Sequence, residues 1–439
     1  MIDAMSEWMI SVDDHLIEPP GVWVDRLPAK HREAGPRWVV EDGMEAWHFE
    51  DVRQSVGGAV TSGAIWPPED RPPVFDPLAF SEIPAACHDP KARLEAMDAD
   101  GVLASLLFPN LPGFAGSLFV RAKDKELALA CVQAYNDWII DEWCASAPGR
   151  FIPLAIVPMW DGALAGAEAE RVIAKGARAI SFSMAPQNLG LPSIDDPGGA
   201  WDPLFSTASD AGVPLCTHLG TGISGKPAEE DGLFTEFAKT MGSDAAGAAV
   251  TAIGMARNPL VGGTLLQLAG QTTLVEWLYS GNFDRYPGLK VVLSENGIGW
   301  IPAVLQSADW MLEMSRNRVT QPADPENDPL RSPEARAVAK ASLERKATRA
   351  RQERLPSEVF RDHVYGCFIH DPVGLKLLDE LGADNVMIET DFPHNSTWFP
   401  HSMPKAQESL TGVPDDVRRK VLRGNAERVF SFTPSEPVG

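Results

Sequence analysis

The 439-residue sequence lacks the features that mark membrane, secreted and disulfide-rich proteins. It has no apolar run as long as the ~18 residues that a membrane-spanning helix needs. Its first residues, MIDAMSEWMI, contain no basic segment followed by an apolar one, so no signal peptide is visible. The five cysteines are scattered and form no C-x-x-C pair, which is typical of reduced thiols rather than of a disulfide framework or a zinc knuckle. We therefore expect a cytoplasmic protein.

Positive charge is also scarce. The 38 Lys and Arg residues face 61 Asp and Glu residues, which gives a net charge of −23. A field of this sign repels phosphate backbones and anionic lipids, so neither nucleic-acid binding nor membrane binding is expected. An anionic substrate would need a local cation or a metal ion. The expected partners are a small-molecule substrate and other copies of the chain, as a homodimer.

No Gly-x-Gly-x-x-Gly phosphate loop follows the first predicted strand, which argues against a dinucleotide-binding fold. Instead, eight short and mostly apolar runs alternate with segments long enough for helices, such as 124–145, 162–175 and 372–381. Such runs are typical of parallel strands buried on both faces. They span residues 9–12, 103–108, 151–157, 177–182, 213–216, 290–293, 364–369 and 386–388. The pattern predicts an α/β fold, a (β/α)8 (TIM) barrel forming a single domain over 1–439, with a doubly wound open sheet as the alternative.

Three segments exceed a minimal barrel. Residues 20–90 are rich in Pro, Trp and Gly and are predicted to form an N-terminal arm or cap over a barrel end. Residues 221–280 and 315–355 are predicted to be helical insertions between strands five and six and between strands six and seven. Within the latter, 331–354 carries eight Lys or Arg against three acids. We interpret it as a solvated surface helix, with docking onto an acidic partner or a second copy as the alternative.

Residues that can bind a metal follow four of the predicted strands. Catalytic groups of such a barrel lie at the C-terminal ends of its strands. Asp13 and His15 follow the first strand and share a face, because alternate side chains of a strand point the same way. His218, Glu295 and Asp391 follow strands five, six and eight. A mixed carboxylate and imidazole set is typical of catalytic metal sites.

Nearby acidic residues have simpler interpretations. Asp14 lies between two predicted ligands, but strand alternation turns it away from them. Asp371 precedes Pro372 and is interpreted as a helix N-cap. Glu18 is interpreted as a turn carboxylate.

Three further residues are predicted to line a substrate pocket. His394 and Trp398 lie in the loop after strand eight, and His370 lies at the tip of strand seven. Loops at the barrel mouth commonly contact substrates. The Trp and Phe residues near this mouth indicate a hydrophobic substrate, aromatic or terpenoid.

The spread of these motifs resembles the amidohydrolase superfamily, and more narrowly its amidohydrolase-related branch, which includes aminocarboxymuconate semialdehyde decarboxylase and γ-resorcylate decarboxylase. The resemblance rests on Asp13-x-His15, Thr217-His218 and TDFPH at 390–394, with support from AYND at 134–137, GRF at 149–151, PGLK at 287–290 and GNA at 424–426. It covers residues from about 9 to 430 and implies Asp13, His15, His218 and Asp391 as metal ligands, with Asp391 also acting as a base.

Two positions depart from the family pattern. The usual first motif is His-x-His or Glu-x-His, so Asp13 is a variant. The usual strand-six histidine is replaced by Glu295, which is expected to act as a base or as an additional ligand. The resulting oxygen-rich set shifts the expected divalent ion from zinc toward manganese or iron.

Several reactions fit this site. In one, the metal activates water for hydrolysis of an amide, ester or lactone-like bond. In another, it anchors a carboxylate for non-oxidative decarboxylation. The catalytic residues are then predicted to be Asp391, Glu295 and His218. The alternatives are a non-haem monooxygenase with two irons, indicated by the extra carboxylate, and a non-catalytic binding barrel.

Overall fold

The structure, a computed structural model, describes residues 7–41, 43–55, 79–222, 259–317, 332–333, 336, 340, 352–394 and 396–435. All strands of its central layer run parallel, in the orders β1-β5-β6 and β12-β11-β10-β9-β8-β7. The strands are β1 (Met9–His15), β5 (Val102–Phe108), β6 (Phe151–Ile152), β7 (Leu154–Ile156), β8 (Ala179–Phe182), β9 (Leu215–His218), β10 (Val291–Ser294), β11 (Val364–Phe368) and β12 (Val386–Ile388).

The two sheets together form the predicted eight-stranded barrel. β6 and β7 occupy one strand position, interrupted at Pro153, which has no N–H to donate to the sheet. On the other side, the Asp391 amide donates to the Asp13 carbonyl at 2.8 Å, and the His15 amide donates to the Phe392 carbonyl at 2.7 Å. These bonds join the chain after β12 to β1 and close the ring, so the open-sheet alternative is wrong.

The strands are buried on both faces, as their apolar sequences predict. On β1, Ile10 and Val12 belong to the same buried cluster as Cys216 of β9 and Met387 of β12, inside the barrel. The register of β1 against β5 shifts between Ser11 and Asp14. Such an irregularity re-aims the side chains that follow it.

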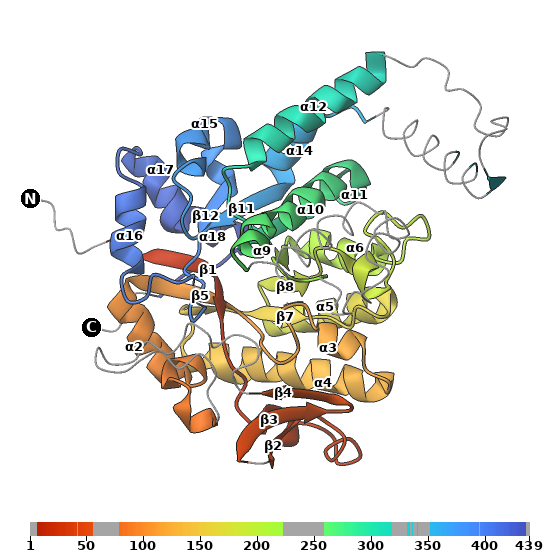
Figure 1. Ribbon diagram of the computed structural model, residues 1–439, viewed down its shortest axis with the longest axis vertical. Coiled ribbons are helices and arrows are strands. Elements are labelled where there is room, and N and C mark those ends of the chain that lie inside the picture. The colour runs from red at the N-terminus through yellow and green to blue at the C-terminus, as the bar shows by residue number, and fades with distance from the viewer. Residues whose placement is uncertain are drawn as a thin grey trace, which may run out of the picture.

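Helices surround the barrel in the order expected of βα units (Figure 1). Asp124 and Asp161 cap two of them by accepting backbone N–H groups of the first turn. The helices are α1 (Gly21–Val24), α2 (Pro90–Asp100), α3 (Ser117–Val120), α4 (Lys125–Trp138), α5 (Gly162–Lys175), α6 (Asp202–Ala211), α9 (Pro259–Leu265), α10 (Gln267–Ser280), α11 (Asn282–Arg285), α12 (Ile301–Asn317), α14 (Pro356–His363), α15 (Leu378–Leu381), α16 (Ser402–Ser409), α17 (Asp415–Arg419) and α18 (Asn425–Val429).

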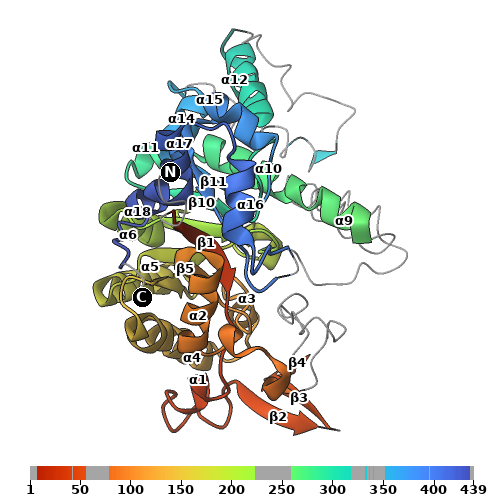
Figure 2. The ribbon, with the colours of Figure 1, turned by 90° about the vertical axis from the view of Figure 1, so that its left-hand side faces the viewer.

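The N-terminal segment forms a small antiparallel sheet, called here the cap sheet, of β2 (Arg37–Glu41), β3 (Met44–Phe49) and β4 (Val52–Ser55). It packs on the helices beside it, because Trp47 contacts Trp23 with ring centroids 5.2 Å apart and Phe49 contacts Phe119 at 5.6 Å. The cap sheet and α12 lie at opposite ends of the long axis in both views (Figures 1 and 2).

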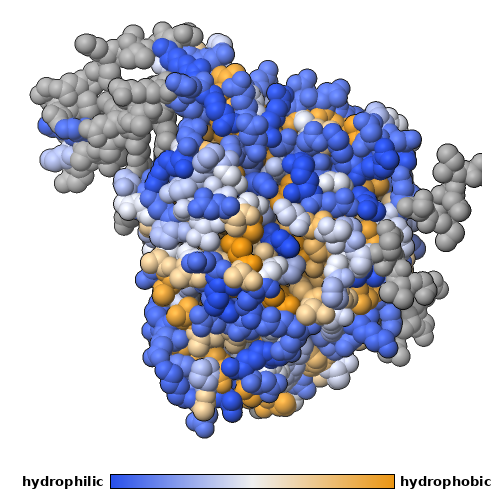
Figure 3. Space-filling view, turned by 180° about the vertical axis from the view of Figure 1, so that it is seen from behind, coloured by the Kyte–Doolittle hydropathy of each residue, from blue (hydrophilic) through white to orange (hydrophobic). Residues whose placement is uncertain are grey.

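The predicted insertions are described in part. Helices α9 and α10 lie in the second half of the first predicted insertion, whereas its residues 223–258, which include a run of small residues at 245–252, lie outside the described residues. Most of the basic segment 331–354 also lies outside them. Among the described helices, none has the length and hydropathy to cross a membrane. Hydrophilic side chains cover most of the face shown in Figure 3, with hydrophobic patches between them.

Candidate metal centre

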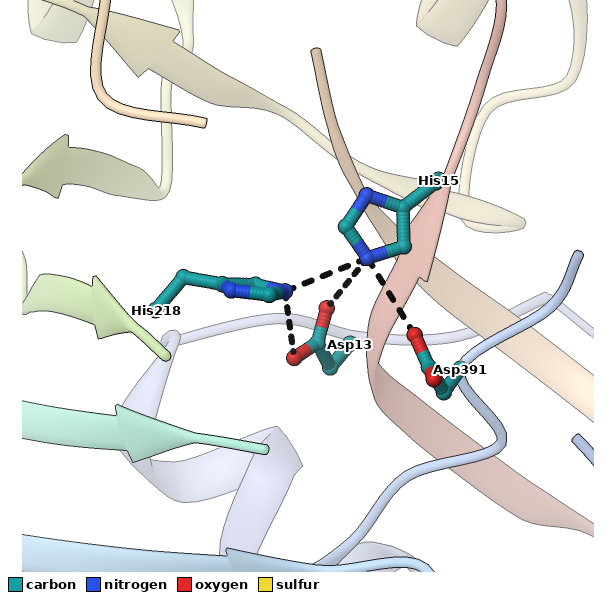
Figure 4. Close-up of side chains that lie close together, drawn as sticks. All are labelled: Asp13, His15, His218 and Asp391. Atoms are coloured by element: carbon teal, nitrogen blue, oxygen red, sulfur yellow. Dashed lines mark hydrogen bonds and ion pairs between the residues drawn. The ribbon is translucent and has the colours of Figure 1, made fainter. Parts of the chain in front are cut away.

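Four of the five predicted ligands converge at the C-terminal end of the barrel (Figure 4). Asp13, His15, His218 and Asp391 are completely buried, and each offers a ligand atom within 4.8 Å of the others. His15 Nε2 lies 3.5 Å from Asp13 Oδ1 and 3.2 Å from Asp391 Oδ1. His218 Nε2 lies 3.3 Å from Asp13 Oδ2 and 3.1 Å from His15 Nε2. The structure therefore assembles side chains separated by up to 378 positions in the chain (391 − 13).

Local backbone geometry aims these groups inward. The shifted register of β1 turns both Asp13 and His15 toward the centre, although Val12 also points into the barrel. His218 is the last residue of β9. Asp391, three residues beyond β12, has φ +55°, a left-handed conformation that is uncommon outside glycine.

The donor chemistry fits a divalent cation. Neither carboxylate oxygen of Asp13 has a hydrogen-bond partner, although both are buried. The His218 Nδ1 lies 2.5 Å from the Leu219 carbonyl, so Nδ1 carries the proton and Nε2 presents a lone pair to the centre. Buried polar atoms are normally hydrogen-bonded, and facing lone pairs repel. A cation at the point they share would satisfy all of them.

The protonation states agree with this interpretation. Burial, followed by the nearby charges of Asp391 and Glu295, holds the pKa of Asp13 well above its usual value. Burial also lowers the pKa of both His15 and His218, so both imidazoles are neutral. Neutral imidazole is the form that binds metals.

A second group shares Asp391 with the first. Glu295, Asp391 and His394 also offer ligand atoms within 4.8 Å of one another. His394 Nδ1 lies 2.6 Å from Asp391 Oδ1, and the His394 ring packs against that of His15 with centroids 3.9 Å apart and planes tilted by 37°. Glu295 Oε2 lies 4.0 Å from His218 Nε2, and the Glu295 side chain is 25% exposed. The fifth predicted ligand is thus adjacent to the buried four.

The three residues of this second group differ in their protonation states. Burial and the Asp391 charge raise the pKa of Glu295 to about 8, so its carboxyl is protonated at neutral pH. Burial alone would raise the pKa of Asp391, but the charge of His394 and the hydrogen bonds from His15 and His394 together outweigh it, so the pKa lies below its usual value. Burial opposes protonation of His394, yet the Asp391 carboxylate raises its pKa. His394 and Asp391 therefore form an ion pair with the proton on the imidazole.

Two supporting carboxylates were not predicted. Asp14 points away from the centre, as expected, and accepts hydrogen bonds from Ser11 Oγ at 3.0 Å, Thr390 Oγ1 at 2.5 Å and the Phe392 amide at 3.0 Å. A further bond from Ser105 Oγ ties it to β5. Asp14 therefore joins the first and last strands behind the ligands.

The other unpredicted carboxylate is Glu389. It is buried and accepts the Glu295 amide at 3.2 Å with each of its oxygens. It lies two residues before Asp391, on the interior side of its strand, so strand alternation was the signal that could have found it. Burial and the charge of Asp13 raise its pKa well above the usual value.

Two acidic residues have structural roles. Glu18 is buried, and its oxygens accept the Asn110 and Leu111 amides at 2.9 Å each. Asp371 accepts the Gly374 amide at 2.7 Å, which holds the turn before the helical turn Gly374–Leu377, although the N-cap position of that helical turn is Val373 rather than Asp371. It also accepts two amides from the turn after β10, at 2.6 and 2.8 Å.

A cavity of about 430 Å³ lies beside the centre. Phe114 belongs to its wall and also contacts both histidines, with ring centroids 4.8 Å from His15 and 4.1 Å from His218. No sequence motif marked this phenylalanine. Trp398 and His370 contact each other at 5.9 Å, but neither lines this cavity, so their role in a pocket stays a prediction.

Comparisons with known proteins agree with this geometry. Residues 82–432 match the amidohydrolase family Amidohydro_2. The γ-resorcylate decarboxylase of Polaromonas sp. strain JS666 is 24% identical over 353 residues, covering 77% of this chain and 86% of that protein. The corresponding enzyme of Rhizobium sp. strain MTP-10005 is 23% identical over 352 residues, with the same coverage.

Solved structures confirm the fold. An amidohydrolase from Mycobacterium avium subsp. paratuberculosis has a TM-score of 0.66 at 20% identity and covers 97% of this chain and 100% of that chain. The 5-carboxyvanillate decarboxylase of Sphingomonas paucimobilis has a TM-score of 0.59 at 20% identity and covers 98% and 100%. The same enzyme from Novosphingobium aromaticivorans, at a TM-score of 0.60 and 16% identity over 97% of each chain, was solved with manganese.

These relatives give the monooxygenase interpretation no support, and they argue against a non-catalytic barrel. The expectation of a metal-dependent enzyme from the amidohydrolase-related branch is confirmed. The chain belongs to the amidohydrolase family Amidohydro_2.

Proposed function

We propose that this protein is a metal-dependent decarboxylase that removes CO2 from an aromatic carboxylic acid without an oxidant. The observation that carries the proposal is the buried set of four converging ligands, in which both oxygens of Asp13 have no hydrogen-bond partner. The relatives named as decarboxylases of γ-resorcylate and 5-carboxyvanillate support the choice of reaction over hydrolysis.

Asp13, His15, His218 and Asp391 would hold the ion, with Glu295 beside them. When bound, a divalent ion supplies a Lewis acid that neutralises the substrate carboxylate and a neighbouring hydroxyl. Manganese is our proposed ion, because three of the five groups are carboxylates and because neighbouring structures contain manganese.

The reaction breaks the bond between the ring carbon and the carboxylate, releases CO2 and places one proton on the ring carbon. The chain can supply that proton from the His394–Asp391 pair, whose 2.6 Å contact holds a proton at Nδ1. Glu295 holds a second proton close to Asp391, because burial and the Asp391 charge raise its pKa to about 8. We propose the pair as the donor and Glu295 as the group that restores its proton.

Aromatic side chains shape the reaction site. Phe108 and Phe114 pack against His218 with ring centroids 4.8 and 4.1 Å away. Their faces exclude water from one side of the centre and offer a stacking surface for a substrate ring. Exclusion of water also strengthens every charge interaction inside the site.

The test is CO2 release from 2,6-dihydroxybenzoate and 5-carboxyvanillate by manganese-loaded protein, with metal content measured in parallel. We expect one manganese per chain and release of CO2 without O2 consumption. His218→Ala should lose both metal and activity, whereas His48→Gln on the cap sheet should lose neither. A His218→Ala variant with full metal content would refute the ligand assignment.

A second candidate function has one specific observation in its favour. The Glu295, Asp391 and His394 group shares Asp391 with the four-ligand group, as expected of a site that holds two ions. Two irons per chain in aerobically prepared protein, with O2 consumed on addition of an aromatic acid, would favour the monooxygenase over the decarboxylase. One ion per chain would exclude it.

A further inference from the structure

We propose that the cavity beside the metal centre binds a second anionic group of the substrate, a carboxylate or a phosphate, through Arg53 and Arg121. This inference rests on the proposed function and narrows its substrate class. The substrate would be an elongated aromatic acid that carries negative charge at both ends.

The cavity is larger than a single aromatic ring requires. Its volume is about 430 Å³. A cavity of about 150 Å³ accommodates benzene. A benzoate-sized substrate held at the metal would therefore leave most of the space unfilled. Pockets of about 300–1,000 Å³ typically bind drug-sized molecules, so the volume indicates a molecule longer than a single ring.

The cavity has an apolar wall, and one side chain of that wall also contacts two of the metal ligands. Phe114 lies against both histidines, and Leu111, Leu118 and Leu189 line the cavity with it. A hydrophobic body could lie along this wall with its reactive carboxylate at the centre. The other end of such a molecule would then reach the polar side chains that complete the lining.

Those polar side chains are positively charged. Among the described residues that line the cavity, Arg53 and Arg121 are the charged ones, and none is acidic. The chain as a whole carries 61 acidic and 38 basic residues, so a cavity lined by two arginines departs from the general composition. Arginine binds carboxylates and phosphates through two parallel hydrogen bonds.

The two arginines are available to a ligand to different degrees. Arg121 is exposed and donates from Nε to the Ser117 carbonyl at 3.4 Å, and no carboxylate pairs with it in the described part of the chain. Arg53 pairs with Glu41 at 2.8 Å, but its side chain is 68% exposed, where such a pair contributes little. A substrate anion can therefore replace Glu41 at low cost.

The position of Arg53 gives the cap sheet a role in recognition. Arg53 and Gln54 belong to β4, and Gln54 Nε2 donates to Asn110 Oδ1 at 3.5 Å. Asn110 belongs to the loop after β5 that also carries Phe114. The cap sheet therefore contacts the barrel mouth at the cavity, where Arg53 can bind the far end of a substrate.

Binding measurements on manganese-loaded protein test the inference. The probes are 2,6-dihydroxybenzoate and three derivatives with an alkoxy chain opposite the carboxylate, ending in a carboxylate, a phosphate or a neutral amide. We expect one or both anionic derivatives to bind about tenfold more tightly than the amide, the effect of one charge-assisted hydrogen bond. The carboxylate and phosphate arms distinguish the two anions.

Variants assign the effect to residues. Arg121→Gln should remove most of the tenfold preference, Arg53→Gln part of it, and neither should change the affinity for the parent acid. Arg361→Gln, an exposed arginine on α14, is the matched control and should change nothing.

Two failures are distinguishable. If the parent acid binds and the anionic tail adds nothing, the inference is wrong and the proposed function stands. If no probe binds to manganese-loaded protein, the proposed function fails and the inference fails with it.

Discussion

The substitution Asp13→Asn should stabilise the metal-free protein while abolishing metal binding. The Asp13 carboxylate is completely buried, has no hydrogen bond, and lies close to the carboxyl groups of Asp391 and Glu295. Asparagine has the same shape but no charge. Its amide can also donate to His218 Nε2, which lies 3.3 Å from Asp13 Oδ2.

The magnitude follows from two contributions. Replacing even a paired buried charge by neutral groups of similar volume is often neutral or stabilising by about 1–4 kcal/mol, and Asp13 has no counter-charge to lose. A new neutral hydrogen bond contributes about 0.5–1.5 kcal/mol. Because Asn is itself polar and partly desolvated, we expect a net gain of about 1–3 kcal/mol in the free energy of unfolding.

The gain should depend on pH. The pKa of Asp13 is raised in the folded protein above its usual value of 3.8, so the folded state keeps a proton that the unfolded chain has released. Wild-type stability therefore falls as pH rises from that value through the folded pKa. The asparagine variant does not lose stability in this way. The stability difference between the variant and the wild type should therefore be absent at low pH and grow as pH rises through the same range.

Metal should reverse the order of stability. A thousandfold excess of manganese over its Kd adds about 4.1 kcal/mol to the wild type and nothing to a variant that cannot bind. The assay is urea unfolding followed by tryptophan fluorescence, in EDTA and in manganese, at several pH values. The reasoning would be refuted if Asp13→Asn were less stable than the wild type in EDTA, or if manganese raised its free energy of unfolding as much as that of the wild type.

Three other substitutions test the supporting structure. Glu18→Gln should cost about 1–3 kcal/mol in urea unfolding, because one of its two bound backbone amides loses an acceptor. The pKa of Glu18 is about 7 in the folded protein against a usual 4.5, so wild-type stability falls as pH rises between these values. The stability difference between the wild type and Glu18→Gln should therefore narrow over this range, and a constant difference would contradict the assigned pKa. Asp14→Asn should weaken manganese affinity about 10–100-fold in a competition titration while the fold survives, and unchanged affinity would exclude a positioning role. Asp391→Gly should be about 1 kcal/mol more stable than Asp391→Ala in metal-free protein, because alanine retains the cost of the left-handed backbone; equal stabilities would argue against that cost.

The sequence predicted the barrel, and it picked out four residues that the structure brings together, for one physical reason. Parallel strands buried on both faces must be apolar throughout, so their ends are marked where polar residues begin. His218 ends β9, Glu295 follows β10, and Asp391 follows β12, each at such a transition. The barrel topology then brings all three to the same end, however far apart they lie in the chain.

The residues that sequence reasoning missed are those whose roles depend on register or on contacts through space. Asp14 was correctly predicted to point away from the centre. Its hydrogen bonds to β5 and to the chain after β12, however, depend on how those strands align. Phe114 carries no motif, because an aromatic residue in a loop after a strand is common. Its place against two histidines arises only when the loops after β5 and β9 are folded together.

Backbone geometry links the ligand positions to the supporting carboxylates. Glu295 and Asp391 adopt φ of +61° and +55°, and this conformation costs a non-glycine residue about 1–2 kcal/mol. If the backbone stayed extended at these two positions, each chain would continue along the barrel axis. The left-handed conformation turns the chain at the barrel mouth instead. The turn is held by the Glu295 amide bound to Glu389 and by the Asp391 amide bound to the Asp13 carbonyl. The same residues that gather negative charge at the centre therefore also fix the strained turns, so a cation there would relieve the repulsion without relaxing the geometry.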